Sequence, residues 1–203
     1  NNTLNNFADA GFGNDINFKF ANTYIGSNLK FQKGKLVFNT GLFYHNYLRN
    51  TSQFNIKQSL DKKYILPEIT LKYDIKRSEK INFRYNLKVR FPSVTNFNSI
   101  YRGNSTLENE LYHQLRLYYY KFSMSKKLNY NLSLSYRKTK DGIKNTNTLE
   151  GINFISEPIL IRNADENISF NGNVSKNYGD FKLSLNGSNS YSKFLQVLNT
   201  TLQ

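Results

Sequence analysis

Histidine, cysteine and acidic side chains carry most catalysis and metal binding, and this chain offers few of them in useful patterns. It has no cysteine and only two histidines, His45 and His113, which lie far apart in the sequence. Neither has an acid or nucleophile motif beside it, so we interpret both as polar residues of strands rather than as catalytic or metal-binding groups. Four acids fall in predicted loops, where we expect them simply to be solvated: Asp9, Asp15, Glu108 and Glu110.

Sequence motifs of known chemistry are also missing. The sequence has no nucleophile elbow, no glycine-rich phosphate loop and no carboxylates at a metal-binding spacing. We therefore predict no catalytic, cofactor-binding or metal-binding residues, no cofactor and no enzyme activity.

The elements that the chain can form are limited by its composition. Hydrophobic residues make up 38% of the 203 residues, and aromatic ones 15%, with sixteen Phe, fifteen Tyr and no Trp. Such a chain is poor in aliphatic residues for a two-sided core but rich in residues that favour strands. No apolar run approaches the roughly 20 residues of a membrane helix, whereas the strands of a membrane barrel leave a much weaker signal. The first residues, 1–6, are polar, so an exported protein would be represented here in mature or truncated form.

Hydrophobic residues alternate with polar ones in most of the chain. Between Ile81 and Phe91 every odd position is apolar and every even position is polar, which is typical of a strand with one wet and one apolar face. The same alternation marks segments 69–76, 128–136, 168–174 and 181–187. Alternation changes phase near Asn22, where we predict a bulge, and again around Tyr118–Tyr120, while both phases are apolar between Leu36 and Leu48.

The connections alternate in length. Short turns are expected at 33–34, 77–80, 126–127 and 178–180, and long polar loops at 50–63, 92–109 and 140–153. Tight turns on one side and extended loops on the other are typical of outer-membrane barrels. Eight strands in four antiparallel hairpins follow: 14–32, 36–47, 64–76, 81–91, 111–125, 128–139, 154–177 with an interruption, and 181–194. The predicted fold class is all-β, an up-and-down transmembrane barrel wall over residues 1–203 that is part of a larger barrel.

Charge placement supports a membrane rather than a nucleic acid as the environment, although the formal net charge is +14. In the regular strands the basic residues occupy the polar phase: Lys72, Arg84, Lys88, Arg90, Arg137 and Lys182. The aromatic residues occupy the other phase, so base stacking and phosphate contacts could not share a surface, and we predict no nucleic-acid partner. Basic residues also cluster at the short turns, where they either solvate the turns or contact anionic lipid. Four tyrosines near predicted strand ends suit an interfacial girdle: Tyr47, Tyr64, Tyr136 and Tyr178.

Two segments resemble a known family. Residues 90–93 (RFPS) with 101–110 (YRGNSTLENE) resemble the R-x-P-S and G-N-P-x-L-x-P-E pattern of TonB-dependent receptors, with Ser105 and Asn109 in place of proline. Residues 136–143 (YRKTKDGI) resemble a strand end, Y-R-K-x-x-D-x-I, of the same receptors. The resemblance covers about a quarter of the chain. It implies a barrel of some twenty-two strands around a plug domain, in the bacterial outer membrane, that takes up scarce nutrients with energy from an inner-membrane protein. We expect the plug and the signal peptide of such a receptor to lie outside residues 1–203.

Three functions are left open by the sequence. The first is the barrel wall of a transport receptor, whose partners would be outer-membrane lipid, the rest of the barrel with its plug, the energising inner-membrane protein and a surface lipoprotein. The second is a complete eight-stranded structural or adhesive barrel, and the third a soluble all-β binding domain. The excess of Lys and Arg over acids favours a wide lumen over the crowded interior of eight strands.

Overall fold

Strands make up nearly all of the structure. The computed structural model describes residues 16–53, 56–92, 107–150, 153–195, 197–198 and 201–202, and none of these residues is helical. The long strands are β1 (Ile16–Lys33), β2 (Leu36–Gln53), β3 (Ile56–Lys76), β4 (Glu79–Arg90), β5 (Glu110–Ser123), β6 (Leu128–Glu150), β7 (Asn153–Tyr178) and β8 (Phe181–Phe194). Two short strands follow, β9 (Val197–Leu198) and β10 (Thr201–Leu202). The all-β prediction is confirmed.

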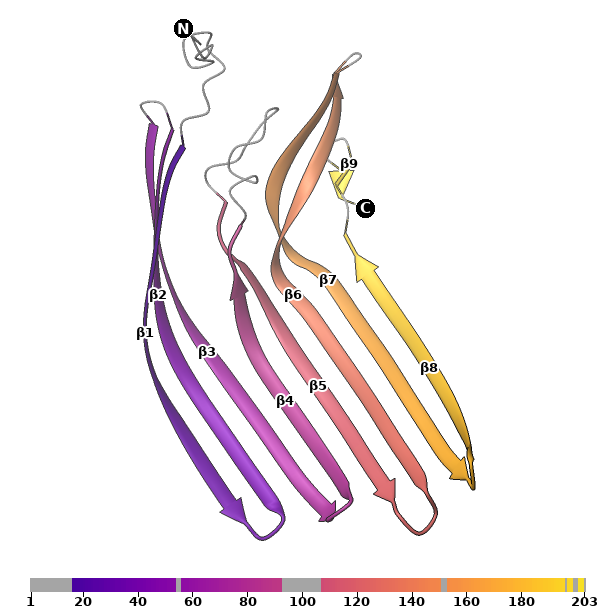
Figure 1. Ribbon diagram of the computed structural model, residues 1–203. Helices are drawn as coiled ribbons and strands as arrows, with labels where there is room; N and C mark the ends of the chain where they lie inside the picture. The colour runs from indigo at the N-terminus through magenta and orange to yellow at the C-terminus, as the bar shows by residue number, and fades with distance from the viewer. Residues whose placement is uncertain are drawn as a thin grey trace, which may run out of the picture. The chain divides into compact units, whose positions relative to one another are not determined.

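Each long strand pairs with its neighbours in the sequence. The order in the sheet is β1-β2-β3-β4-β5-β6-β7-β8, and β1 and β8 are not paired with each other (Figure 1). The four short turns, at 34–35, 77–78, 124–127 and 179–180, lie together at one end of the strands. Gly34 and Gly179 adopt φ values of 55° and 61°, which other residues rarely reach and which the tight hairpin turns require. The four predicted hairpins are therefore confirmed.

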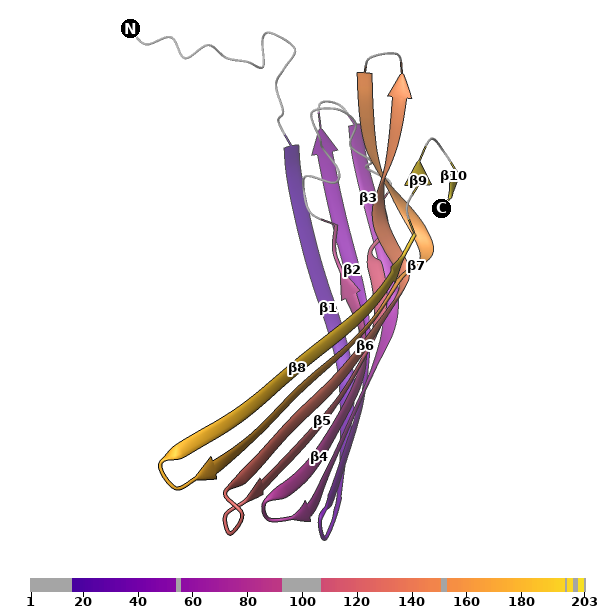
Figure 2. The same cartoon turned by 90° about the vertical axis from the view of Figure 1, so that its right-hand side faces the viewer.

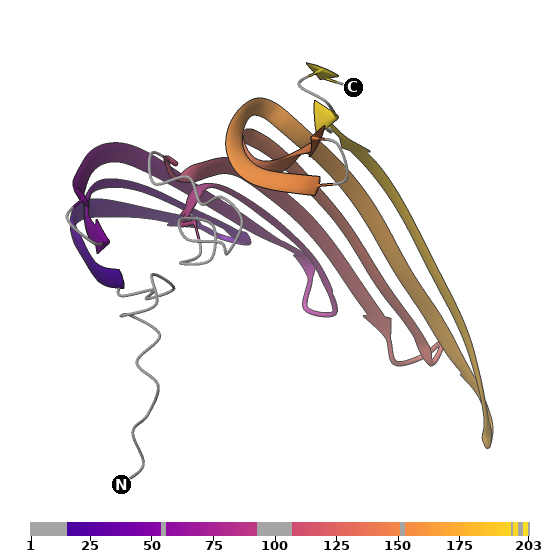
Figure 3. The same ribbon diagram turned by 90° about the horizontal axis from the view of Figure 1, so that it is seen from above.

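Two of the predicted long loops are wrong. Most of residues 50–63 lie in β2 and β3, and β6 pairs with β7 as far as Glu150 opposite Asn153, so that 140–150 is also strand. The β6–β7 hairpin extends past the end of β8, and β9 pairs in parallel with β6 beside it (Figures 2 and 3). These extensions carry Asn, Thr and Lys on both phases, so no alternation marks them as strands. Of the third predicted loop, 92 and 107–109 are described and lie outside any strand.

Pairing also settles one change of phase. Strand β5 pairs with β4 and β6 without a shift through Tyr118–Tyr120, so both faces of the sheet carry aromatic residues there. The register shifts instead at Lys140, which has no partner in β5 or β7, and beside Asp74 in the β3–β4 pair. The bulge near Asn22 stays a prediction.

The chain divides into two compact units. The first contains residues up to Ile25 and Tyr44–Tyr64, and the second contains Gly26–Phe43 and Ile65 onward, including the four short turns. Among the described residues no helix is long and apolar enough to cross a membrane.

Burial is inverted relative to a soluble domain. Among the described residues, five hydrophobic ones are buried, against seven polar ones: Arg49, Asn86, Asn109, Glu110, Gln114, Thr139 and Ser175. Large hydrophobic side chains are instead exposed, among them Phe181 at 81% and Leu185 at 74%. An apolar surface of this extent needs an apolar environment to cover it.

Candidate functional site

The second unit has one polar and one apolar sheet face. Residues directly opposite each other on paired strands point to the same face, so the register defines both. One row across the polar face runs Thr70, Arg84, Arg116, Ser135, Ser169 and Ser190, from β3 to β8. The basic residues predicted for the polar phase all lie on this face: Lys72, Arg84, Lys88, Arg90, Arg137 and Lys182.

On β3–β5 the polar face is basic. Arg84 lies directly opposite Arg116, an arrangement of like charges that is unfavourable unless an anion or water lies over it. Three amide oxygens on the same face, those of Asn82, Asn86 and Asn129, are buried and accept no hydrogen bond from the described residues. Buried polar atoms require partners, so this face must be covered by water or by a polar filling.

On β6–β8 the middle of the polar face is uncharged. Serine and asparagine fill almost every position, and they bond across strands: Ser135 Oγ lies 2.6 Å from Ser169 Oγ, and Asn167 Nδ2 donates to Ser192 Oγ at 2.7 Å. The hydroxyl of Tyr118 donates to Asn131 Oδ1 at 2.9 Å, beside a shallow cleft of about 380 Å³. These groups can donate and accept hydrogen bonds without attracting either charge.

Glu110 joins three strands at the end away from the short turns. Its side chain is 8% exposed and accepts from Arg90 Nε of β4 through Oε2 and from the backbone N–H of Ile143 of β6, at 2.9 Å, through Oε1. The prediction that Glu110 is solvated is therefore wrong, because a guanidinium and a backbone N–H, not water, donate hydrogen bonds to its carboxylate. Leu107 and Asn109, just before it, are also buried, at 2% and 5% exposed.

The two resembling segments meet at this carboxylate. Arg90 opens the first motif, Glu110 closes it, and Ile143 ends the second, although 20 and 33 residues separate Glu110 from its two partners. Residues 93–106 of the first motif lie outside the described part of the chain, as do Asp9 and Asp15. The matching residues thus link β4, β5 and β6 through the Glu110 carboxylate.

A cleft of about 520 Å³ opens beside Glu110. Lys144 Nζ lies 2.6 Å from Asp165 Oδ1 in its wall, and the guanidinium of Arg137 lies 5.1 Å from the ring centre of Tyr112. The charges of the cleft are largely paired, so it offers no unbalanced site for an ion.

The apolar face of the second unit is bounded by two charged bands. Near the short turns, Glu79 contacts Lys121 at 3.4 Å and accepts from the Tyr119 hydroxyl at 2.8 Å. Toward the other end, Lys138 and Glu166 form a pair at 3.0 Å. Lys121, Lys138 and Glu166 lie on the apolar phase, which the analysis of the regular strands missed. Between the bands every residue of β6 on this face is apolar: Leu132, Leu134 and Tyr136.

The first unit holds a cluster of stacked rings. Tyr24 stacks on His45 with ring centres 5.0 Å apart, His45 on Tyr47 at 5.3 Å, and Phe20 on Tyr47 at 6.1 Å. Tyr64 tilts against Tyr47 at 5.8 Å. Tyr47 is only 6% exposed, so the predicted girdle role of Tyr47 and Tyr64 is wrong: they pack together in a cluster.

The other two predicted girdle tyrosines differ from each other. Tyr178 ends β7 with Lys176 Nζ 4.4 Å above its ring, an arrangement that suits an interface. Tyr136 lies well inside β6, because that strand continues to Glu150.

Both histidines are hydrogen-bonded strand residues. His45 Nδ1 lies 3.1 Å from Asn22 Oδ1 and 3.0 Å from the Tyr47 hydroxyl, and His113 Nδ1 lies 2.9 Å from the Tyr85 hydroxyl. In the part of the chain that the structure describes, no group of three His, Asp or Glu side chains is placed to hold a metal.

Solved structures show the fold in known proteins. The FrpB iron transporter of Neisseria meningitidis (F3-3 variant) aligns with 92% of this chain at a TM-score of 0.62 and 13% identity. The alcaligin outer membrane receptor FauA of Bordetella pertussis aligns with 87% at a TM-score of 0.55 and 14% identity. No protein-family model and no curated sequence matches the chain.

These likenesses establish the fold alone. The chain covers 28% of FrpB and 31% of FauA, so it spans less than a third of either protein. Its fold is that of a stretch of an outer-membrane receptor barrel, which confirms the predicted fold class and fits the resemblance to TonB-dependent receptors.

Proposed function

We propose that this chain is part of the barrel wall of a TonB-dependent receptor in the bacterial outer membrane, and that the receptor takes up a scarce nutrient. The single observation that carries the proposal is the opposition of the two sheet faces. One carries exposed apolar rows between charged bands, and the other carries serine, asparagine and unbalanced arginine. Lipid would cover the apolar face, and a water-filled lumen would solvate the polar face.

Unpaired edges support a larger barrel. Within the described part of the chain, strands β1 and β8 each have one neighbouring long strand, and an unpaired edge within lipid would leave backbone groups without hydrogen bonds. Further strands of the same protein would complete the pairing. The alternative of a complete eight-stranded barrel would require β1 to pair with β8, and these strands are not paired.

The nutrient is proposed to be an iron chelate. FrpB is an iron transporter and FauA a receptor for alcaligin, and the arginine-lined part of the polar face would attract an anionic complex. The partners would be outer-membrane lipid, the plug inside the barrel, an energising inner-membrane protein and a surface lipoprotein.

The test is uptake by living cells. A strain lacking the gene, and the same strain complemented with it, would be grown under iron limitation and supplied with radiolabelled ferric chelates. We expect the protein to be recovered in the outer-membrane fraction. We also expect the cells to accumulate labelled iron only when they carry the gene and maintain the proton-motive force. Equal uptake with and without the gene would refute the transport role, and recovery of the protein in the soluble fraction would refute the membrane location.

A further inference from the structure

The short-turn end of the second unit carries a large excess of positive charge. Within four residues of a short turn there are eleven basic residues: Lys30, Lys33, Lys35, Lys76, Arg77, Lys80, Lys121, Lys126, Lys127, Lys176 and Lys182. Three acids lie in the same segments: Asp74, Glu79 and Asp180. We call this set of cations the basic rim.

At the opposite end, strands β4–β8 are nearly balanced in charge. Residues 86–92, 107–114, 137–148, 156–167 and 191–195 contain eight basic residues against six acids. Three ion pairs join them: Arg90 with Glu110, Lys138 with Glu166, and Lys144 with Asp165. In the described residues of the basic rim, only Lys80 and Lys121 pair with an acid, at 3.7 and 3.4 Å. Along β4–β8 the excess of positive charge therefore lies at the short-turn end.

Two members of the basic rim identify what it faces. Lys121 and Lys176 lie on the apolar face, in line with Tyr130 and Leu183, and not on the polar face. Around Lys176 are exposed apolar side chains, including Tyr178 at 53%, Phe181 at 81% and Leu183 at 66%. A long lysine at the edge of an apolar surface extends its stem over that surface and its ammonium into the polar layer above.

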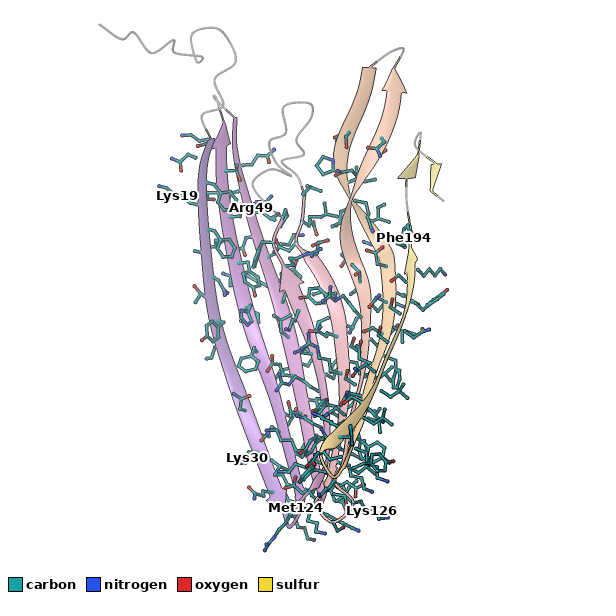
Figure 4. All side chains as sticks on the ribbon, turned by 45° about the vertical axis from the view of Figure 1, so that its right-hand side comes forward. Lys19, Lys30, Arg49, Met124, Lys126 and Phe194 are labelled. Atoms are coloured by element: carbon teal, nitrogen blue, oxygen red, sulfur yellow. The ribbon has the colours of Figure 1, made fainter. Side chains whose placement is uncertain are left out.

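We propose that the basic rim binds the phosphates of anionic phospholipids in the leaflet at the short-turn end. This inference rests on the proposed outer-membrane location but not on transport. Figure 4 shows Lys30, Met124 and Lys126 near the same end of the strands, and Phe194 toward the other. Met124, 83% exposed in the turn beside Lys126 and Lys127, adds an apolar contact next to the cations. Phosphate attracts several ammonium groups at once, and apolar side chains hold the acyl chains below it.

The experiment measures lipid preference on the full-length protein. The protein in detergent would be titrated with equal amounts of phosphatidylglycerol and phosphatidylethanolamine, and bound lipids counted by native mass spectrometry. The rim variant carries Lys121→Gln, Lys126→Gln, Lys127→Gln and Lys176→Gln. The matched control removes the same charge elsewhere, through Lys88→Gln, Lys140→Gln, Arg162→Gln and Lys193→Gln.

We expect the wild type and the control to prefer phosphatidylglycerol, and the rim variant to lose roughly fivefold of that preference for each lysine in contact. The preference should weaken as salt rises, because the cations are mostly exposed. No preference in the wild type, or an equal loss in both variants, would overturn the proposal. An unchanged lipid preference in the rim variant would also overturn it. If the wild type, but not the rim variant, could then be cross-linked in cells to an acidic protein, the basic rim would be a protein-binding surface instead.

Insertion into vesicles of phosphatidylethanolamine alone separates this proposal from the membrane location. A rim variant that inserts normally and shows no change in lipid preference contradicts only the basic rim. A wild type that fails to insert contradicts the membrane location itself.

Discussion

Leu134 lies midway between the two charged bands of the apolar face, so an arginine there tests the membrane assignment directly. On β6 the bands lie at Tyr130, opposite Lys121, and at Lys138, opposite Glu166, four residues to either side of Leu134. Eight residues of strand span about 26 Å, and a tilt of about 40° brings the separation along the membrane normal to about 20 Å. That distance is close to the roughly 25 Å apolar band of an outer-membrane barrel. Leu134 would then lie near the midplane.

Leu134→Arg should therefore cost about 2–4 kcal/mol of folding free energy. That cost lowers the ratio of folded to unfolded protein roughly 30-fold to several-hundred-fold. Tyr136→Arg, closer to a band, should cost less. Ser133→Arg is the matched control, because Ser133 lies on the polar face between Tyr118 and Asn171, where an arginine stays in water. Its cost should be below about 1 kcal/mol.

The assay is reversible urea unfolding of the full-length protein in phospholipid vesicles, followed by the mobility shift of folded barrels on gels. Equal costs for Leu134→Arg and Ser133→Arg would refute the assignment of the faces. A cost that does not fall from position 134 to position 136 would refute the placement of the midplane.

Two further predictions concern packing within the second unit. Glu110→Ala should lower the free energy of unfolding by about 2 kcal/mol, because it leaves the Ile143 N–H and the Arg90 guanidinium without their acceptor; in the same unfolding assay, a loss no larger than that of the control Glu68→Ala would contradict the role of Glu110 in linking the strands. Gly26→Ala should destabilise by about 1–3 kcal/mol, because a methyl group there collides with the ring of Phe43, whereas Gly187→Ala meets no atom within 4 Å and should be nearly neutral. A double-mutant cycle with Phe43→Ala should remove most of the Gly26→Ala cost, and additive costs would show that the ring is not responsible.

Much of the fold was predictable because lipid and water impose a period of two on strands that separate them. Strand β8 matches its predicted bounds, Phe181–Phe194, and all four hairpin turns lie where short polar breaks interrupt the alternation. The failures occur where that constraint ends. The extension of β6 beyond Lys140 keeps its backbone ladder with β7, but polar residues such as Asn, Thr and Lys occupy both of its phases. Hydrogen bonds between backbones specify no side chain, so a hairpin of this composition has the sequence of a loop.

The role of Glu110 was hidden for a different reason. Its partners come from two other strands, and they lie near Glu110 only in the observed register. Alternation shows which face a residue occupies, but it does not show which residue of the next strand lies opposite. The motif residues Arg90, Glu110 and Ile143 were the available signal, because a resemblance spread over separate segments indicates residues that meet in space. Tyr47 was misplaced similarly: proximity to a predicted strand end suggested an interface, whereas the true end of β2 is Gln53 and the ring stacks in a cluster.

The charged residues of the apolar phase carry the most information about the membrane, although they break the pattern that predicted it. Lys121 and Glu79 near one end, and Lys138 and Glu166 near the other, pair with each other across strands. In a soluble sheet packed against a second layer, such pairs would be buried at a cost in desolvation, and nothing would fix their depth. In a bilayer the two depths are fixed by the headgroup layers, and the only apolar-phase positions that tolerate charge are those within reach of them. Two charged bands with no charged residue between them on the apolar face of β4–β8 are therefore a stronger indication of lipid than perfect alternation would be.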